Sequence, residues 1–347
     1  MSGVQPSESA AASVDSGRSG RWWLRRTARV VGWAGVAAAA VGVLTHYVGL
    51  ESNKLIILSS FVPQLIGVGV VGVCFLALTG SWKSGAVGVG VLALGLFTQA
   101  PLFVADTQDY SGYTAGPDLR ILQANIRLGE ADVDALLAQI RDRSVDVLTV
   151  QELTDDAVDR LRAAGVDSIL PHQYLDTRES GGGGTGIYSA LPLRDTAVLG
   201  RFAMANLRAK VDVGEGRTIS LVAVHPMPPY PSPAWMWAAE MEKLSVLVHD
   251  LGADGDPIVV SGDFNSTYSH SRYRAILTDG FEDAAELTGA GLVLTYPADK
   301  MYPAMIGIDH IVVRDVAVSG FERVDLPGSD HHGLFATLTP QFASEPR

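Results

Sequence analysis

The stretch PIVVSGDFN, residues Pro257–Asn265, holds the pattern that decides the fold. An apolar run opens it, and a glycine, an acid and an amide close it, as expected of a buried β-strand that ends in polar side chains. In layered α/β folds, such strand ends present side chains from rigid backbone to a shared cleft. Asp263 and Asn265 could also be plain turn formers, so the other strand ends decide between the two interpretations.

Several other predicted strands carry polar residues in the same way. These are Asn125 in LRILQAN, Glu152 after DVLTVQ, His225 in TISLVAVH, Asp309 in IGIDHIVV, and Asp330 with His331 in GSDHH. Carboxylate and amide oxygens suit Mg²⁺ or Mn²⁺, and histidines beside them can supply protons or hydrogen bonds. The combined set indicates a hydrolytic centre that uses a hard metal ion.

Outward from these motifs, strand and helix patterns fill residues 118–347. The predicted helices are Ala131–Arg141, Asp155–Ala164 and Ala234–Leu251. The predicted strands are Leu119–Asn125, Asp146–Gln151, Thr185–Ser189, Leu207–Val213, Thr218–His225, Pro257–Ser261, Ile308–Val313 and Gly333–Leu338. We therefore expect a four-layer α/β sandwich, with two mixed β-sheets flanked by helices.

The first part of the chain is different in character. Residues 1–29 are rich in small and polar residues and then basic, and we expect a disordered basic tail. Residues 30–105 contain three uncharged stretches, Val30–Leu50, Leu55–Trp82 and Ser84–Ala105, each long enough for a transmembrane helix of about 20 residues. Residues 106–117 are turn-rich and form the expected linker to the catalytic domain at 118–347.

The charge pattern predicts an orientation in a cell membrane. The cluster Arg21, Arg25, Arg26 and Arg29 precedes the first span, and the positive-inside rule keeps that end in the cytoplasm. Three crossings of the lipid bilayer then place the catalytic domain outside the cytoplasm. Cys74 is the single cysteine, so no disulfide forms within the chain and no multi-cysteine metal site exists.

Acidic residues are concentrated in the C-terminal part. Only Glu8, Asp15 and Glu51 of the 38 acids precede Asp106, and the net charge of the whole chain is −12. An acidic domain does not adhere broadly to nucleic acid, because that adhesion depends on neutralising phosphates with basic residues. A nucleic-acid substrate remains open, since a divalent cation can supply positive charge locally.

The order N, QE, H, GDFN, DH, SDH resembles the endonuclease/exonuclease/phosphatase superfamily, over about residues 118–340. That resemblance implies metal ligation by Glu152, helped by Asn125 and Asp330. It also implies that Asp263 orients or deprotonates the attacking water and that Asn265 binds the phosphate. Asp309 and His331 would form a dyad at the phosphate, and His225 matches the other catalytic histidine of the deoxyribonuclease-like branch.

The expected function is that of a membrane-anchored, divalent-metal-dependent phosphodiesterase that acts by in-line attack of water. The substrate would be nucleic acid or a phospholipid head group, and no protein partner is evident from the sequence. One departure concerns Arg127, which stands where abasic-site endonucleases carry an extra acid. The alternatives are a phosphomonoesterase of the same fold and a catalytically idle membrane scaffold.

Neighbouring residues receive structural interpretations. We expect His332 to be a bystander beside His331, and His310 to be a strand residue near the site. Gly181–Gly184 is expected to form a flexible loop beside the cleft rather than a phosphate cradle. Trp235 and Trp237 are expected to pack the start of a helix.

Overall fold

The computed structural model describes residues 9–49, 51–106 and 108–344. The chain divides into two compact units. One consists of Met1–Leu44 and Phe61–Gln99, and the other of Thr45–Ser60 and Ala100–Arg347. The short segment between the first two apolar stretches therefore belongs to the same unit as the predicted catalytic domain.

The first unit is built from apolar helices: α1 (Ser9–Tyr47), α3 (Val62–Leu78) and α4 (Trp82–Gln99). Glycines let α1 and α3 approach closely. A Cβ atom added to Gly35 would lie 2.8 Å from the Cα atom of Gly72, so only glycine allows this separation. Small residues at helix contacts are typical of packing in lipid, where burial of apolar side chains gives no net driving force.

Among the described residues, two helices have the length and composition to cross a membrane, Arg21–Tyr47 and Trp82–Phe103. A third crossing would need α3 to be counted together with α2 (Asn53–Ser60) as one bent pair. The sequence predicted a single second span, Leu55–Trp82, but the helix is interrupted at Phe61. Pro63 supplies the reason, because a proline in a helix interior lacks the N–H donor and clashes with the preceding turn, yet fits the first turn of a new helix.

The start of α1 also differs from expectation. A disordered tail was expected through residue 29, of which residues 1–8 lie outside the described part. From Ser9 onward the backbone is helical and continuous with the apolar helix. Extending an existing helix needs no new nucleus, and alanine and arginine are good helix formers, so the helix can extend into this polar stretch.

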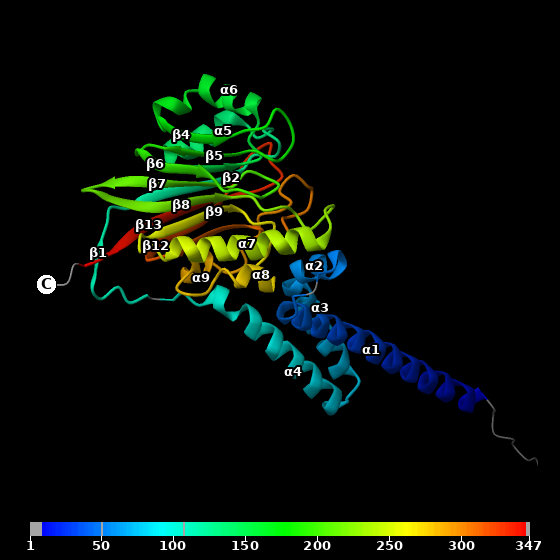
Figure 1. Ribbon diagram of the computed structural model, residues 1–347. Helices are drawn as coiled ribbons and strands as arrows, with labels where there is room; N and C mark the ends of the chain where they lie inside the picture. The colour runs from blue at the N-terminus through cyan, green and yellow to red at the C-terminus, as the bar shows by residue number, and fades with distance from the viewer. Residues whose placement is uncertain (1–8, 50, 107, 345–347) are drawn as a thin grey trace, which may run out of the picture. The chain divides into compact units, whose positions relative to one another are not determined.

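The second unit contains two β-sheets (Figure 1). The first is ordered β1-β13-β2-β3-β5-β4, with β12 also paired to β13, and the second is ordered β10-β11-β9-β8-β7-β6. The strands of the first sheet are β1 (Tyr113–Ala115), β2 (Leu119–Asn125), β3 (Val147–Gln151), β4 (His172–Asp176), β5 (Thr185–Ser189), β12 (Val316–Val324) and β13 (Gly333–Ala343). Those of the second are β6 (Leu193–Val198), β7 (Leu207–Gly214), β8 (Arg217–Val224), β9 (Ile258–Asp263), β10 (Glu282–Asp283) and β11 (Asp309–Arg314).

Both sheets are mixed. In the first sheet β2 and β3 are parallel, and in the second β8 and β9 are parallel, while the remaining neighbours are antiparallel. The register places Asn125 beside Gln151 in the first sheet and Asp309 beside Asp263 in the second. Each sheet therefore brings two polar strand ends together at one edge.

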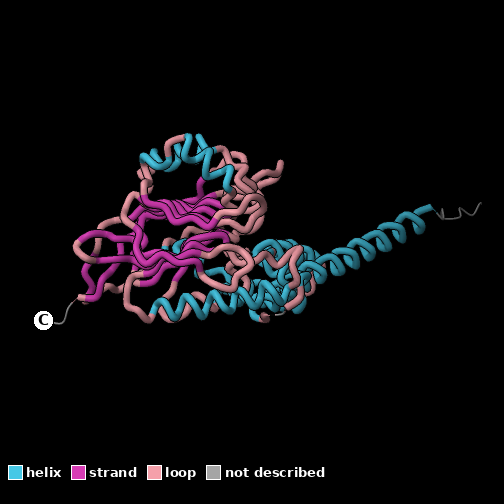
Figure 2. Tube along the Cα trace, turned by 45° about the horizontal axis from the view of Figure 1, so that its top comes forward, coloured by secondary structure: helices cyan, strands magenta, loops and turns pink. Residues whose placement is uncertain are grey.

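Helices cover the outer faces of the stacked sheets, as Figure 2 shows. On the first sheet lie α5 (Val133–Asp142) and α6 (Asp155–Ala163), and on the second lies α7 (Ala234–Gly252). Short helices η1 (Ala100–Phe103), η2 (Val166–Ser168), α8 (Ser271–Arg274) and α9 (Ala284–Leu287) join these elements. The predicted four-layer sandwich is confirmed.

Every strand predicted from the sequence is present within a few residues of its expected bounds. Five strands were not predicted: β1, β4, β6, β10 and β12. Most of their residues are partly or fully exposed, so they lack the apolar run that identifies a buried strand. β1 lies within the expected linker, where it pairs with the end of β13.

One face of each central strand changes from apolar to polar toward the same end of the sandwich. On β2, Leu119 and Ile121 lie in the core between the sheets, and Gln123 and Asn125 continue that face. β3, β8, β9 and β11 follow the same rule, because alternate residues of a strand share a face. The side chains Gln151, His225, Asp263 and Asp309 therefore meet between the two sheets.

Candidate active site

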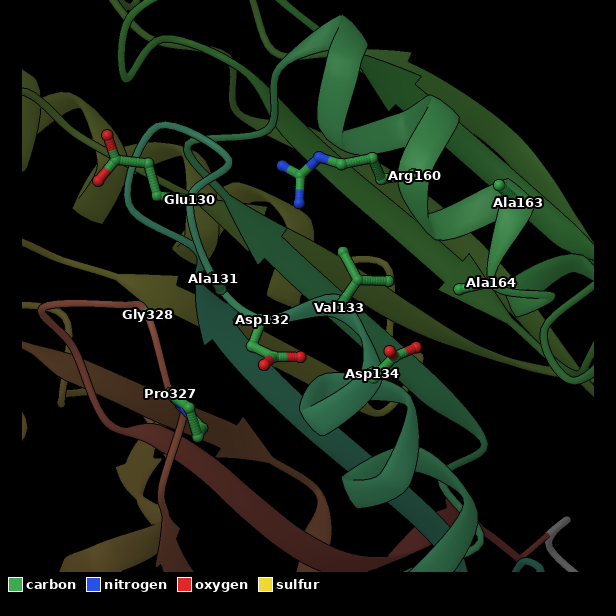
Figure 3. Close-up of a pocket in the computed structure, with 10 residues that line it drawn as sticks. All are labelled: Glu130, Ala131, Asp132, Val133, Asp134, Arg160, Ala163, Ala164, Pro327 and Gly328. Carbon is green, nitrogen blue, oxygen red and sulfur yellow. The ribbon is translucent and has the colours of Figure 1, made fainter.

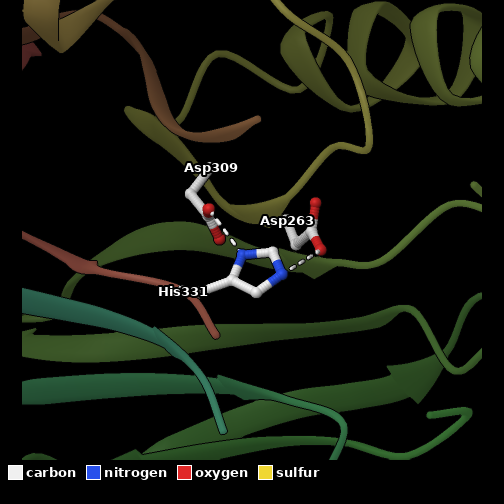
Figure 4. Close-up of side chains that lie close together, drawn as sticks. All are labelled: Asp263, Asp309 and His331. Carbon is white, nitrogen blue, oxygen red and sulfur yellow. Dashed lines mark hydrogen bonds and ion pairs between the residues drawn. The ribbon is translucent and has the colours of Figure 1, made fainter. Parts of the chain in front are cut away.

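The centre of this polar end is a histidine between two carboxylates (Figure 4). His331 Nδ1 lies 2.8 Å from Asp309 Oδ2, and His331 Nε2 lies 3.8 Å from Asp263 Oδ2. All three side chains are at least 95% buried. The bond to Asp309 fixes the orientation of the imidazole ring, which leaves Nε2 as the nitrogen available to a reacting group.

The charges in this centre shift one another. Burial opposes a positive charge on His331, but the Asp309 and Asp263 carboxylates outweigh it and raise the pKa of His331 to about 10. Burial and the nearby Asp309 charge raise the pKa of Asp263 to about 6. Burial also opposes ionisation of Asp309, yet contact with His331 holds the pKa of Asp309 below its ordinary value. His331 and Asp309 therefore each favour the charged form of the other.

Asp263 is the most connected residue of the site. Its Oδ2 accepts a hydrogen bond from Asn125 Nδ2 at 3.0 Å, and its Oδ1 accepts one from the backbone N–H of Asn265 at 2.8 Å. Asn265 has a φ of 48°, a left-handed conformation that asparagine tolerates better than most residues. That turn returns the amide of Asn265 toward Pro226, whose carbonyl it binds at 3.0 Å.

His225 approaches Asp263 from the other side. Its Nε2 lies 3.6 Å from Asp263 Oδ2, and its backbone is held at both polar groups by the side chain of Asn206. Across the described residues, the buried Nδ1 atom of His225 has no hydrogen-bond partner. A buried imidazole nitrogen without a partner indicates a group that binds something further.

Glu152 and Asp330 form a second centre beside the first. Glu152 accepts hydrogen bonds from Asn125 Nδ2 at 3.3 Å and from the backbone N–H of Leu128 at 2.7 Å. Its φ of 60° is unusual for a residue with a long side chain, and such strained backbone is concentrated at functional sites. Burial raises the pKa of Asp330, and the nearby Glu152 charge raises it further.

These residues fit a divalent cation. Glu152 and Asp330 are two carboxylates close enough to repel, and within the described ranges neither forms an ion pair with a lysine or arginine. The Asn125 amide oxygen accepts a bond from the backbone N–H of Arg127, so Asn125 would have to rotate or share that oxygen to become a ligand. Carboxylate-rich oxygen sites are the usual hosts of Mg²⁺ and Mn²⁺.

Asp263, Asp309 and His331 could hold a cation by distance alone, since their ligand atoms lie within 4.8 Å of one another. His331 Nδ1 is already bonded to Asp309, so only Nε2 of its ring remains for a ligand. The two carboxylates also accept hydrogen bonds from side-chain amides, Asp263 from Asn125 and Asp309 from Gln123.

All eight residues singled out from the sequence thus lie in one connected set. The sequence did not identify four further members: Gln123, Gln151, Thr295 and Tyr296. Gln123 Nε2 donates to Asp309 Oδ1 and to Gln151 Oε1, each at 2.8 Å. Thr295 binds the backbone at Asp309, and the ring of Tyr296 packs against His331 at 4.9 Å between centroids. The polar alternation of LRILQAN could have indicated Gln123.

His310 is a strand residue near the site, as expected. Its Nδ1 bonds to Asp283 at 2.8 Å, and its Nε2 bonds to the carbonyl of Ser266 at 2.8 Å. Tyr273 stacks on its ring and also donates to Asp283. Through the carbonyl of Ser266, this buried network holds the turn that follows Asn265.

The remaining residues that the sequence singled out lie near the site and are not part of the connected set. His332 Nδ1 lies 2.9 Å from an oxygen of the exposed Asp325, and burial lowers the pKa of His332, which favours the neutral ring. This contact fits a bystander. Trp237 is buried and donates to the carbonyl of Asn265 at 3.2 Å, whereas Trp235 is 62% exposed.

Arg127 forms ion pairs with Asp299 and Glu130. In the glycine loop, a Cβ atom on Gly182 would lie 3.2 Å from Glu152 Cδ.

Two surface hollows share the turn at Pro327 and Gly328. The larger, of about 650 Å³, is shown in Figure 3 and is lined by residues of α5, α6 and the turn at Pro327 and Gly328. None of the eight candidate residues lines it. A second hollow of about 380 Å³ shares Pro327 and Gly328 and reaches Arg127, Ser329 and His332. The second hollow therefore adjoins the site, and the first does not.

Comparison with protein-family models gives one assignment. The model described as the Endonuclease/Exonuclease/phosphatase family matches residues 122–331. The match begins in β2 and ends at His331, so it spans all eight candidate residues. No curated protein matches the sequence significantly.

Solved structures share the fold. Humanised D. rerio TDP2 matches with a TM-score of 0.53 and 18% identity, over 64% of this chain and 98% of that chain. A Bacteroides vulgatus endonuclease/exonuclease/phosphatase matches with a TM-score of 0.50 and 21% identity, over 64% and 98% of the two chains. The Neisseria 3′ phosphatase NExo matches with a TM-score of 0.50 and 17% identity, over 63% and 98%.

Proposed function

The chain belongs to the Endonuclease/Exonuclease/phosphatase family, and from that premise we propose that it hydrolyses a phosphodiester with the help of a divalent cation. The observation that carries the proposal is the position of Asp263. Its carboxylate lies within 4 Å of His225 and His331 and is bonded to Asn125. A carboxylate surrounded by such donors is suited to hold a water molecule against phosphorus.

The residues of the chain divide the chemistry among them. Asp263 accepts the proton of the attacking water as the new bond between oxygen and phosphorus forms. His331, held by Asp309, donates a hydrogen bond from Nε2 to a phosphoryl oxygen, and Asn265 donates another. His225 hydrogen-bonds the departing oxygen as its bond to phosphorus breaks. Fixed donors of this kind stabilise charge that grows in the transition state.

Glu152 and Asp330, with Asn125 beside them, would hold the Mg²⁺ or Mn²⁺ ion. When bound, such an ion supplies positive charge that offsets the phosphate and lowers the barrier to displacement. On the protein side, Leu128 and Asn125 hold the Glu152 carboxylate in place before the ion arrives. Preorganised ligands make the site selective for an ion of the right size and charge.

The charge of the site favours diesters over monoesters. Four carboxylates meet there, those of Glu152, Asp263, Asp309 and Asp330. Arg127, whose charge acts on Asp330, is already paired with Asp299 and Glu130. A phosphate monoester carries up to two negative charges at neutral pH, whereas a diester carries one. Without a free basic cluster, the dianion has the larger electrostatic cost.

Nucleic acid and phospholipid head groups are the two substrate classes that we propose. D. rerio TDP2 is described in complex with a single-strand DNA product, and the Neisseria 3′ phosphatase with a product DNA hairpin. The apolar helices favour a phosphodiester that occurs at a membrane. We further propose that these helices anchor the protein in the cell membrane and that its catalytic domain lies outside the cytoplasm.

A substrate panel tests the proposed function. Purified full-length protein with Mg²⁺ should cleave bis-(p-nitrophenyl) phosphate faster than p-nitrophenyl phosphate, and then act on either DNA or phospholipid vesicles. Asp263→Asn is the matched control, because it keeps the size of the side chain and removes the charge. A clear preference for monoesters would support the phosphatase alternative, and no hydrolysis of any ester would leave a scaffold.

A further inference from the structure

The connection between the first two apolar helices is part of the catalytic unit. Residues Thr45–Ser60 group with Ala100–Arg347. Within this segment, α2 buries Ile56 to 3% exposure in the core that also contains Trp237, Phe264 and Tyr273. Figure 1 shows α2 beside α7 and α8. The segment lies outside residues 122–331, which match the family model.

The side chain of Asn53, the first residue of α2, makes three hydrogen bonds to the backbone of one loop. Its Nδ2 donates to the carbonyls of Pro229 at 2.6 Å and Ser232 at 2.7 Å, and its Oδ1 accepts from the N–H of Ala234 at 3.2 Å. Ala234 begins α7, and the preceding residue, Pro233, has no side chain that could cap the helix. Asn53 therefore caps α7 from a distant part of the chain.

The loop that Asn53 holds, residues 226–233, belongs to the active site. It starts directly after His225, and its first carbonyl, that of Pro226, accepts the hydrogen bond from Asn265 Nδ2. Glu240 of α7 holds the N–H of Met227 at 2.7 Å. The loop is thus fixed at its start by Asn265 and Glu240 and at its end by Asn53.

A second contact ties the same segment to the turn after Asn265. His270 Nε2 donates to the carbonyl of Ile56 at 2.9 Å, and its Nδ1 accepts from the N–H of Thr267 at 2.8 Å. The ring of His270 is buried and packs against Trp237. Trp237 in turn donates to the carbonyl of Asn265. Residues of α2 are therefore hydrogen-bonded both to the 226–233 loop and, through His270, to the segment that follows Asn265.

We infer that Asn53 is a positioning residue of the active site, and that the inter-helix connection completes a catalytic centre otherwise built from residues 122–331. This inference rests on the proposed function. Asn53 acts through the 226–233 loop, which sets the position of His225 and the amide of Asn265. The anchor segment is then needed for turnover as well as for attachment.

The test uses full-length protein in detergent micelles or lipid nanodiscs. Asn53→Ala should lower kcat for bis-(p-nitrophenyl) phosphate about tenfold, with a small change in KM, because misplaced catalytic groups affect the transition state most. Lys54→Ala, at the exposed next position, is the matched control and should behave like the wild type.

Asn53→Asp separates positioning from simple helix capping. Aspartate caps a helix as well as asparagine does and would accept from Ala234, but it cannot donate to the carbonyls of Pro229 and Ser232. Because the two donated hydrogen bonds are lost, kcat should stay as low as in Asn53→Ala although the cap on Ala234 is kept. Full recovery of kcat in Asn53→Asp would reduce Asn53 to a stabilising cap and overturn the inference.

Hydrogen exchange supplies a readout that does not need activity. In Asn53→Ala, amides of residues 226–236 should exchange faster while those of β8 and β9 keep the wild-type rate. Unchanged exchange in the 226–236 segment would overturn the inference whether or not the enzyme is active. Faster exchange in a protein without phosphodiesterase activity would instead leave the loop support standing and refute the proposed function.

Discussion

His331 and His332 are adjacent in the chain and have different environments. His331 is buried between Asp309 and Asp263, whereas His332 faces Asp325 at the surface. Both residues lie directly before β13, and only the first of the two rings enters the space between the sheets. Only the inward ring lies within reach of Asp263, where we propose that the attacking water is held.

Alanine substitutions at the two positions separate these roles. His331→Ala should lower turnover by about 10²-fold or more, the scale of a lost proton-transfer or oxyanion-stabilising group. His332→Ala should lower it only mildly, because the ring touches no other candidate residue. Steady-state kinetics on a soluble diester measure both effects, and a reversal of their order would contradict the assignment of the dyad.

Residues that end an apolar strand in a polar group could be predicted from the sequence. Asp263, Glu152 and Asn125 are recognisable because a run of buried residues precedes each. Gln123 lies inside such a run, so in the sequence it is an isolated polar residue. Its role becomes visible only in the structure, where it donates to Asp309 of the opposite sheet. Asn53 has no local signal, because its function depends on a loop 176 residues away.

At the scale of elements, α2 shows how a buried histidine links two segments. His270 makes both of its contacts only as a neutral ring, which donates from Nε2 to the carbonyl of Ile56 and accepts at Nδ1 from Thr267. Burial, with smaller contributions from Arg274 and His310, lowers the pKa of His270 to about 4. Protonation would remove the acceptor for Thr267 and place a charge in the core.

This shift predicts an acid-sensitive contact. The folded pKa lies below the unfolded value of 6.5, so the contribution of His270 to stability is present above pH 6.5 and is lost as pH falls toward 4. Thermal unfolding of the wild type and of His270→Gln, followed from pH 7.5 to 4.5, measures it. The wild type should lose more stability on acidification, and parallel curves would contradict the prediction.

Strands and helices with a clear pattern of apolar residues could be predicted from the sequence, and those without such a pattern could not. β2, β3 and β9 are buried along their length, so sequence and structure agree. β6 is mostly exposed and is defined by its pairing with β7, which no local pattern reveals. The break between α2 and α3 had a local signal in Pro63, but the uninterrupted apolar run outweighed it.

At the scale of the whole molecule, chain connectivity limits the membrane topology. Residues Thr45–Ser60 pack in the catalytic unit, so they share its side of any membrane. The chain from Phe61 to Gln99 must then leave and return, which α3 and α4 do if both cross as a hairpin. The proposed topology, with a cytoplasmic Arg21–Arg29 cluster, three crossings and an external catalytic domain, therefore needs α3 to cross on its own, without α2.

Reporter fusions and cysteine labelling test that topology. Alkaline phosphatase fused after Arg347 should be active, and green fluorescent protein at the same position should be dark. In a Cys74→Ser background, an impermeant maleimide should label Lys54→Cys on intact cells and Lys83→Cys only after permeabilisation. Labelling of both, or fluorescence of the fusion, would place the catalytic domain elsewhere.

The central claim is that the carboxylates around Glu152 and Asp263 form a metal-dependent phosphodiesterase centre. Hydrolysis of bis-(p-nitrophenyl) phosphate by the full-length protein tests it most directly, measured in excess chelator and again after Mg²⁺ or Mn²⁺ is restored. Glu152→Gln and Asp263→Asn serve as controls against a contaminating enzyme. A metal-dependent centre should show no activity in chelator, recovery with either ion, and loss of activity in both variants, whereas full activity in excess chelator would contradict metal dependence.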